Sequence, residues 1–168
     1  MNIKMLLPII SFILISITPA TFALDTRPVI SLSLAKKMAD ACEANQVELG
    51  YRKVNIAIVD DGANLVLFRR QNNAFLGSID IALGKAKSSA SIPYSTRTIS
   101  EIVYGKDGKP GRVPGLAHSK NVVAFAGGLP IKTKDGTLIG AIGVSGATGD
   151  EDELCAQAAI DAVANELK

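Results

Sequence analysis

Side chains able to act as nucleophiles, bases or metal ligands are sparse in this sequence. His118 is the only histidine, and the two cysteines, Cys42 and Cys155, fall in segments with helical spacing of apolar residues. Nucleophilic catalysis needs a hydroxyl or thiol beside a base, and no motif brings such groups together. A lone histidine in a loop is more often a solvated residue. We therefore expect no catalytic residue.

Four consecutive acidic residues, Asp150 to Glu153, form the densest group of possible metal ligands. They stand where the last helix should begin, and the helix dipole stabilises negative charge at that end. Asp150 and Glu153 also have the spacing of a capping box. Asp60 and Asp61 precede a glycine, as in a turn. The sequence therefore predicts capping and turn roles here, and no metal site.

The first 23 residues have the pattern of a secretory signal. A single lysine precedes an apolar run from Met5 to Ile17, and small residues follow up to Ala23; this order is typical of a cleaved signal peptide. The run is shorter than the roughly 20 residues that a membrane-spanning helix needs. We expect cleavage after Ala23, with cleavage after Ala20 or an uncleaved anchor as alternatives. The domain over 24–168 would then be periplasmic or secreted, with no stable membrane span.

Charge and cysteine content narrow the class of protein further. Lys and Arg number 18 against 16 Asp and Glu, and this near-neutral balance argues against nucleic-acid binding. Export would place Cys42 and Cys155 where disulfides are stable. They pair only if their two helices touch, so a disulfide and two buried thiols both remain open.

Apolar periodicity predicts one α+β domain over residues 24–168. Its two most apolar strands are expected side by side in the centre of an antiparallel sheet. The architecture is profilin-like, with a five-stranded antiparallel sheet flanked by helices. The expected helices are Ser33–Leu49, Ser78–Ala90, Thr98–Tyr104 and Asp150–Leu167, and the expected strands are Val54–Val59, Leu65–Phe68, Asn121–Phe125, Pro130–Lys132 and Thr137–Ser145, with a loop over Gly105–Gly115.

The glycines of the predicted sheet and one lysine of a predicted helix indicate what covers the sheet and what faces outward. Gly127, Gly128, Gly140 and Gly143 put bare backbone in and beside the predicted sheet. Glycine within a strand marks the close approach of another backbone or of a ligand, so either a packed helix or a flat ligand would cover them. In the helix 78–90, Lys85 is expected on the outer side of the apolar stripe.

Four segments together resemble the GlcG/HbpS family of haem-binding and haem-degrading-related proteins. They read Ile-Ala-Ile-Val-Asp-Asp-Gly over 56–62, Ser-Ile-Asp-Ile-Ala-Leu-Gly-Lys-Ala over 78–86, Ala-Gly-Gly-Leu-Pro-Ile over 126–131, and Leu-Ile-Gly-Ala-Ile-Gly-Val-Ser-Gly-Ala over 138–147. The resemblance covers nearly all of residues 24–168 in order. It implies a profilin-like domain that forms homo-oligomers and, in some members, binds haem.

The resemblance also implies candidate ligand contacts. Thr96 matches a threonine that one branch of the family associates with haem, and Arg97 or Lys85 would suit a propionate because a cation pairs with a carboxylate. Two departures affect the ligand: residues 24–50 contain no histidine, and Gln71 to Ala74 replaces the usual Met-Asp-Gly-Ala. The full candidate set is Tyr94, Thr96, Arg97, His118, Gly127 and Gly128.

These observations predict an exported protein that binds haem or a related tetrapyrrole, weakly to moderately, in haem or iron sensing or handling. Arg97 or Lys85 would supply the cation and His118, a tyrosine or Thr96 the iron ligand. One alternative is a small-molecule accessory enzyme or haem-degrading protein of the same family. Another is an interaction protein whose homo-oligomer is its function.

Overall fold

The computed structural model describes residues 27–168, and the predicted signal peptide lies outside this range. The main sheet has four antiparallel strands in the order β2-β1-β6-β5. They are β1 (Asn55–Asp60), β2 (Leu65–Arg70), β5 (Gly128–Lys132) and β6 (Leu138–Ser145). Ile58 of β1 lies opposite Ile142 of β6. The expected pairing of the two most apolar strands at the centre is therefore confirmed.

The predicted strand over Asn121–Phe125 is wrong, so the sheet has four strands and not five. This segment runs along α2 (Ser78–Ser91), where the Ser88 hydroxyl donates to the Asn121 carbonyl at 3.1 Å. The same hydroxyl accepts from the Val123 N–H at 2.8 Å. A side chain of the helix thus binds backbone groups that a neighbouring strand would otherwise pair.

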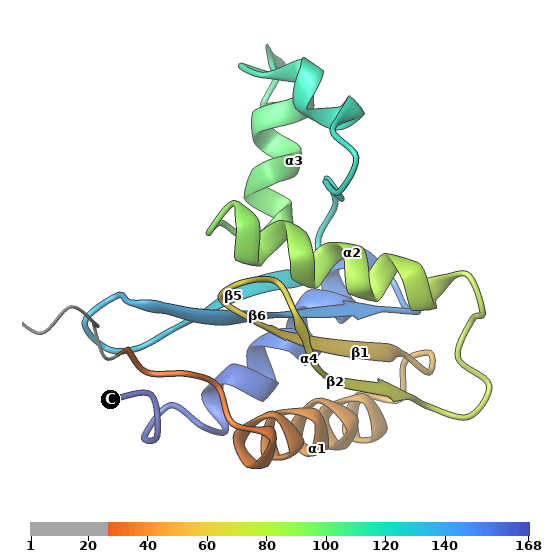
Figure 1. The fold of residues 1–168 in the computed structure, drawn as a ribbon. Coiled ribbons are helices and arrows are strands. Elements are labelled where there is room, and N and C mark those ends of the chain that lie inside the picture. Colours follow the sequence, from red (N-terminus) through yellow and green to blue (C-terminus); the bar gives the residue numbers. More distant parts are fainter. Residues whose placement is uncertain (1–26) are drawn as a thin grey trace, which may run out of the picture.

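Helices cover both faces of the sheet (Figure 1). α2 packs on one face against β6 and β1, and α1 (Leu32–Leu49) and α4 (Gly149–Asp161) lie on the other. Cys42 of α1 and Cys155 of α4 form a disulfide with a Cα–Cα distance of 4.6 Å. The two helices therefore touch, and of the two alternatives for the cysteines the structure has the disulfide.

The helix ends show where local sequence rules apply. The Ser31 side chain accepts from the Leu34 N–H and caps α1, and Gly50, with φ of 71°, ends it. α4 begins at Gly149, one residue earlier than predicted, because Thr148 and Glu151 form the capping box. The prediction of Asp150 as its cap is wrong, as is the extension of the helix to Leu167.

A short arm stands away from the sheet, above α2 in Figure 1. It comprises α3 (Thr96–Tyr104), the two-residue strands β3 (Gly105–Lys106) and β4 (Lys109–Pro110), and the 3-10 helix η1 (Pro114–His118). Ile99 and Val103 form its own small apolar cluster with Ala124. Within residues 27–168, no helix combines the length and apolar content needed to cross a membrane.

Candidate functional site

Thr96 and Gly128, two of the predicted site residues, lie in direct contact. The Thr96 hydroxyl accepts a hydrogen bond from the Gly128 N–H at 2.9 Å, and Thr96 is 0% exposed. A Cβ added at Gly128 would meet the Thr96 methyl at 2.6 Å and the Lys85 carbonyl at 2.7 Å. In this geometry Thr96 ties the start of α3 to the start of β5, and its hydroxyl points to backbone and not to solvent.

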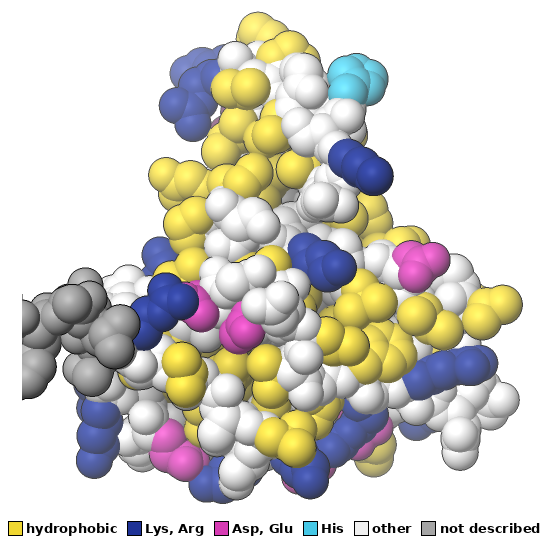
Figure 2. Space-filling model, in the orientation of Figure 1, with side chains coloured by type: hydrophobic (Ala, Val, Ile, Leu, Met, Phe, Trp, Pro, Cys, Tyr) yellow, Lys and Arg dark blue, Asp and Glu magenta, His cyan; other side chains and the backbone are white. Residues whose placement is uncertain are grey.

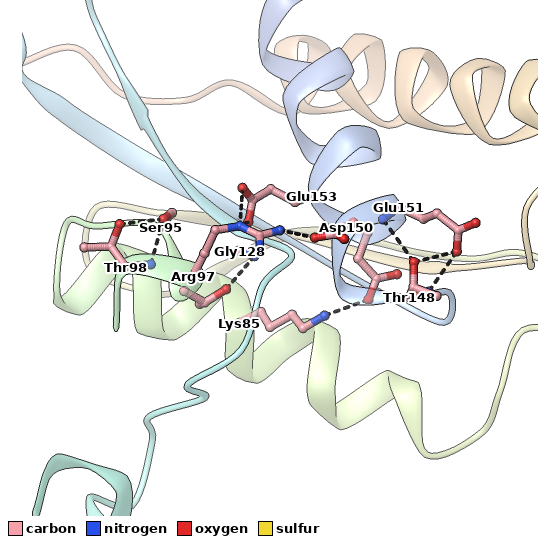
Figure 3. A network of polar contacts seen from close by, with 11 residues as sticks. Lys85, Ser95, Arg97, Thr98, Gly128, Thr148, Asp150, Glu151 and Glu153 are labelled. Atoms are coloured by element: carbon pink, nitrogen blue, oxygen red, sulfur yellow. Dashed lines mark hydrogen bonds and ion pairs between the residues drawn. The ribbon is translucent and has the colours of Figure 1, made fainter. Parts of the chain in front are cut away.

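Arg97 joins the arm to the N-terminus of α4 (Figure 3). Its Nε lies 3.1 Å from Glu153 Oε1, and its Nη2 donates to Asp150 Oδ1. These two hydrogen bonds raise the pKa of Arg97. Beside the guanidinium lies an open cavity of about 350 Å³, lined by these three residues with Leu154 and Gln157.

Tyr94 and His118 lie apart from this contact. Tyr94 precedes α3 and is 54% exposed. His118 ends η1, which Figure 1 places at the outer end of the arm, and its side chain is exposed. The structure therefore brings together Thr96, Arg97 and the glycine pair of the candidate set, and holds His118 away from them.

A buried ion pair that sequence reasoning missed lies directly behind the glycines. Lys85 Nζ donates to Asp152 Oδ2 at 2.7 Å and to the Val144 carbonyl at 2.8 Å. Its third neighbour is the ring of Phe125, with the centroid at 4.8 Å. A Cβ at Gly127, whose φ is 119°, would lie 2.6 Å from Lys85 Nζ. Gly127 is thus required by the ammonium group and by its own backbone conformation.

The expectation of Lys85 on the outer side of its helix, as a cation for a ligand, is wrong. Its side chain is 0% exposed and has a carboxylate partner. Burial lowers the pKa of Lys85 and raises the pKa of Asp152, while their mutual attraction opposes both shifts. The spacing contained a signal: Ala82, Lys85 and Ser89 lie three and four residues apart and share one helix face.

The acidic cluster has three separate roles. Asp150 and Glu153 bind Arg97, and Glu151 completes the capping box with Thr148 (Figure 3). Asp152 binds Lys85 and also accepts from the Ala147 N–H at 3.0 Å. In residues 27–168, no three His, Cys, Asp or Glu side chains are grouped so that they could hold a metal ion.

The glycines of the sheet are covered by the protein itself. A Cβ at Gly143 would lie 2.2 Å from the Ala82 carbonyl of α2, and one at Gly140 would lie 2.2 Å from the Val59 carbonyl of β1. Close packing of helix and strand therefore accounts for both residues. The flat-ligand alternative has no room at these two positions.

The fold and these contacts define a small α+β domain. In it α2 covers one face of the sheet, and a buried ion pair connects α2 to α4. Residues 30–161 match the family model described as haem degrading protein HbpS-like, and the chain belongs to this family. The predicted GlcG/HbpS-like family is thus confirmed.

Individual relatives agree with this membership. An uncharacterized 15.0 kDa protein of Citrobacter freundii is 39% identical over 79% of this chain and 90% of its own length. The crystal structure of the Klebsiella pneumoniae protein ORFY is 34% identical, with a TM-score of 0.74 over 85% of this chain and 96% of that one. A structure titled as a PduOC:heme complex is 27% identical, with a TM-score of 0.70 over 80% of this chain and 95% of that one.

Proposed function

We propose that this protein binds haem or a related tetrapyrrole. The observation that carries the proposal is the family match over residues 30–161, together with the similarity in fold to a protein solved as a haem complex. The site chemistry supports a carboxylate-bearing ligand, because Arg97 lies at a surface cavity and a guanidinium matches a carboxylate in shape and charge.

An apolar side chain beside Arg97 could contact one face of a macrocycle. Leu154 lines the cavity and is 52% exposed. The cavity is open and small for a ligand of porphyrin size, so a single chain would cover the ligand only partly. Asp150 and Glu153 also compete with a propionate for Arg97. We therefore expect weak to moderate affinity for one chain.

The proposal includes a homo-oligomer in which a second copy covers the other face of the ligand. The projecting arm supports it, because Tyr104 and Val113 are large apolar side chains exposed on it. Figure 2 shows this apolar surface over the upper part of the molecule. Sedimentation at micromolar concentration, with and without haem, tests the oligomer; a monomer under both conditions would contradict it.

We also propose that the protein is exported and works in haem or iron handling outside the inner membrane. The signal pattern of residues 1–23 supports export, and the Cys42–Cys155 disulfide suits an oxidising compartment. N-terminal sequencing of the exported pool should give Leu24 as the first residue. Retention of Met1 would contradict cleavage.

Haem titration tests the binding proposal, with the Soret band as readout. The unmodified protein should shift the band, and Arg97→Ala should weaken binding about tenfold, in line with a charge-assisted hydrogen bond. Arg112→Ala removes an exposed cation from the arm and should leave the affinity unchanged. Absence of any haem band would defeat the proposal for this protein.

The family description also favours a second candidate, haem degradation. The same mixture, supplied with a reductant and oxygen, tests it. Loss of the Soret band over time, faster than with free haem, would indicate turnover. A stable band would leave binding as the function.

A further inference from the structure

Three loops meet at the end of the sheet opposite the C-terminus, at the right-hand edge of Figure 1. They are 50–53 after α1, 71–77 after β2, and 146–148 after β6. Cavities of about 260 and 520 Å³ lie between them and share Arg52, Phe75 and Gly146. A third, of about 540 Å³, is lined by Arg70 to Asn73 and continues from the first through Asn73.

Three cations of this region, Arg52, Lys53 and Arg70, form no ion pair with the side chains of residues 27–168. Among residues 27–168 there are eight ion pairs, and none of them uses Arg52, Lys53 or Arg70. Of the two acidic side chains at the cavities, Glu43 pairs with Arg69 at 2.8 Å, whereas Glu151 accepts from Thr148 and keeps its charge near Arg52. Arg52, Lys53 and Arg70 together outnumber this one carboxylate. The region therefore presents a net positive charge.

A buried pair of glutamines holds two of the loops in place. Gln71 Oε1 accepts from the Val54 N–H at 2.8 Å, and Gln71 Nε2 donates to Gln46 Oε1 at 3.1 Å. Lys53 Nζ donates to the same Gln46 oxygen at 3.0 Å. Both glutamines are buried. These hydrogen bonds fix the backbone that carries the cations before a ligand binds. Because less of the chain must then be ordered on binding, the entropic cost of binding is lower.

The loop after β2 adds amide donors beside the cations. Asn73 has a φ of 68°, a left-handed conformation that is uncommon outside glycine. The Ala74 N–H donates to the Gln71 carbonyl at 3.1 Å and closes the turn. Asn72 and Asn73 are exposed and line the cavity with Arg70. Amide N–H and guanidinium groups together are suitable donors for oxyanions.

An aromatic wall completes the region. The Phe75 ring is 52% exposed, and the Arg52 guanidinium lies over it with 4.9 Å to the centroid. Gly146 lines the same cavities as Phe75 and Arg52, and its missing Cβ makes room for the Lys53 carbonyl, which such a Cβ would meet at 2.4 Å. On the right-hand edge of Figure 2, basic side chains lie beside apolar ones. The basic side chains could bind an anionic group, and the Phe75 ring could contact an apolar body.

We propose that this end of the sheet binds a small organic molecule with an oxyanion group, a carboxylate or a phosphate, attached to a flat apolar body. The oxyanion binds Arg70 and Lys53 with the amides of Asn72 and Asn73, and the body lies against Phe75. The region uses none of the residues at Arg97, so it does not depend on the haem proposal.

NMR titration with three probes of the same shape tests this site. Benzoate and phenyl phosphate should shift the backbone amides of residues 52, 53 and 70–75, and neutral benzamide should not. The tighter of the two anions identifies the oxyanion that the site prefers. Equal shifts from benzamide, or anion shifts confined to other residues, would overturn the proposal.

Charge removal provides the second measurement. Arg70→Gln should weaken binding of the preferred anion about tenfold, as should Lys53→Gln, and Phe75→Ala should weaken benzoate more than acetate. Two single variants, Lys109→Gln and Arg112→Gln, serve as controls. Each removes one exposed cation from the arm and should leave affinity unchanged. Unchanged affinity in Arg70→Gln, with a native amide spectrum, would overturn the site.

Discussion

Lys85 and Asp152 are charged residues buried within the described part of the chain. Lys85 and Asp152 lose their hydration, and the 2.7 Å contact between them compensates only because the remaining donors and acceptors are also bonded. The contact also fixes Gly127 and orders the segment that leads into β5. The pair therefore connects α2, α4 and the sheet at one point.

Removal of one partner should destabilise the protein strongly. Lys85→Met leaves the Asp152 carboxylate buried and unpaired, and we expect a loss of about 3–5 kcal/mol in the free energy of unfolding. Urea denaturation measures it. Lys87→Met changes an exposed lysine of the same helix and should cost almost nothing.

The double variant Lys85→Met with Asp152→Leu distinguishes the charge from the packing. It should recover most of the loss, because no charge is then left without a partner. A double variant as unstable as Lys85→Met alone would show that the packing, and not the charge, dominates at this position.

The hydrogen bond at the Thr96 hydroxyl should also contribute to stability. Thr96→Val keeps the shape but leaves the Gly128 N–H without an acceptor, so the protein should lose about 1–3 kcal/mol of stability. Thr96→Ser keeps the oxygen and should lose less. If Thr96→Val instead left thermal stability unchanged while it weakened haem binding, Thr96 would contact the ligand.

Element boundaries follow the hydrogen bonds at the helix ends. Both Thr148 with Glu151 and Asp150 with Glu153 have the capping spacing, but the capping box normally begins with Ser or Thr. The residue type therefore favours Thr148, the cap that the structure has. The same helix end also has a contact that spacing does not reveal, because Arg97 binds Asp150 and Glu153 from 53 and 56 residues away. A contact so distant in the chain is invisible to local rules.

Much of the fold could be predicted because it follows from patterns among residues that are close in the chain. The four helices and four of the five strands follow from apolar periodicity, which is local. The prediction of a strand over 121–125 was wrong because the hydroxyl of Ser88, more than 30 residues earlier, binds backbone groups of this segment. At the candidate site, the ion pairs of Arg97 with Asp150 and Glu153 were not predicted, and the burial of Lys85 depends on what packs on α2. The prediction that Arg97 binds a ligand stays a prediction.

The α4 cap can be tested by substitution. Thr148→Ala removes the acceptor of the Glu151 N–H, and about 1 kcal/mol of stability should be lost. Thr148→Ser should retain nearly all of it, and Asp150→Ala should not affect the cap. Thermal melts of the three variants at neutral pH provide the comparison.

The same cap should respond to acid. Hydrogen bonds from Thr148 lower the pKa of Glu151 below its ordinary 4.5, so the folded state favours the carboxylate. The stabilisation is present above pH 4.5 and is lost as the pH falls through the lower folded value. The Tm difference between the unmodified protein and Glu151→Ala should therefore shrink in melts below about pH 4. A constant difference from pH 7 to 3 would argue against the charged cap.

At the scale of the whole molecule, the disulfide joins the first helix to the last. Cys42 and Cys155 are 113 residues apart, so the bond encloses most of the described chain. α1 and α4 already pack through buried side chains such as Met38 and Ala159. The disulfide therefore restrains the unfolded chain more than it shapes the folded one.

The double variant Cys42→Ala with Cys155→Ala should fold and be less stable. A closed loop of this length restricts the unfolded ensemble by several kcal/mol, and measured losses on removal are about 2–5 kcal/mol. Circular dichroism should show unchanged helix content, while urea denaturation moves to a lower midpoint. Unmodified protein unfolded in the presence of a reductant serves as the control and should unfold at nearly the midpoint of the double variant. Equal midpoints for the oxidised protein and the double variant would mean that helix packing alone sets the stability, and that the disulfide adds nothing to it.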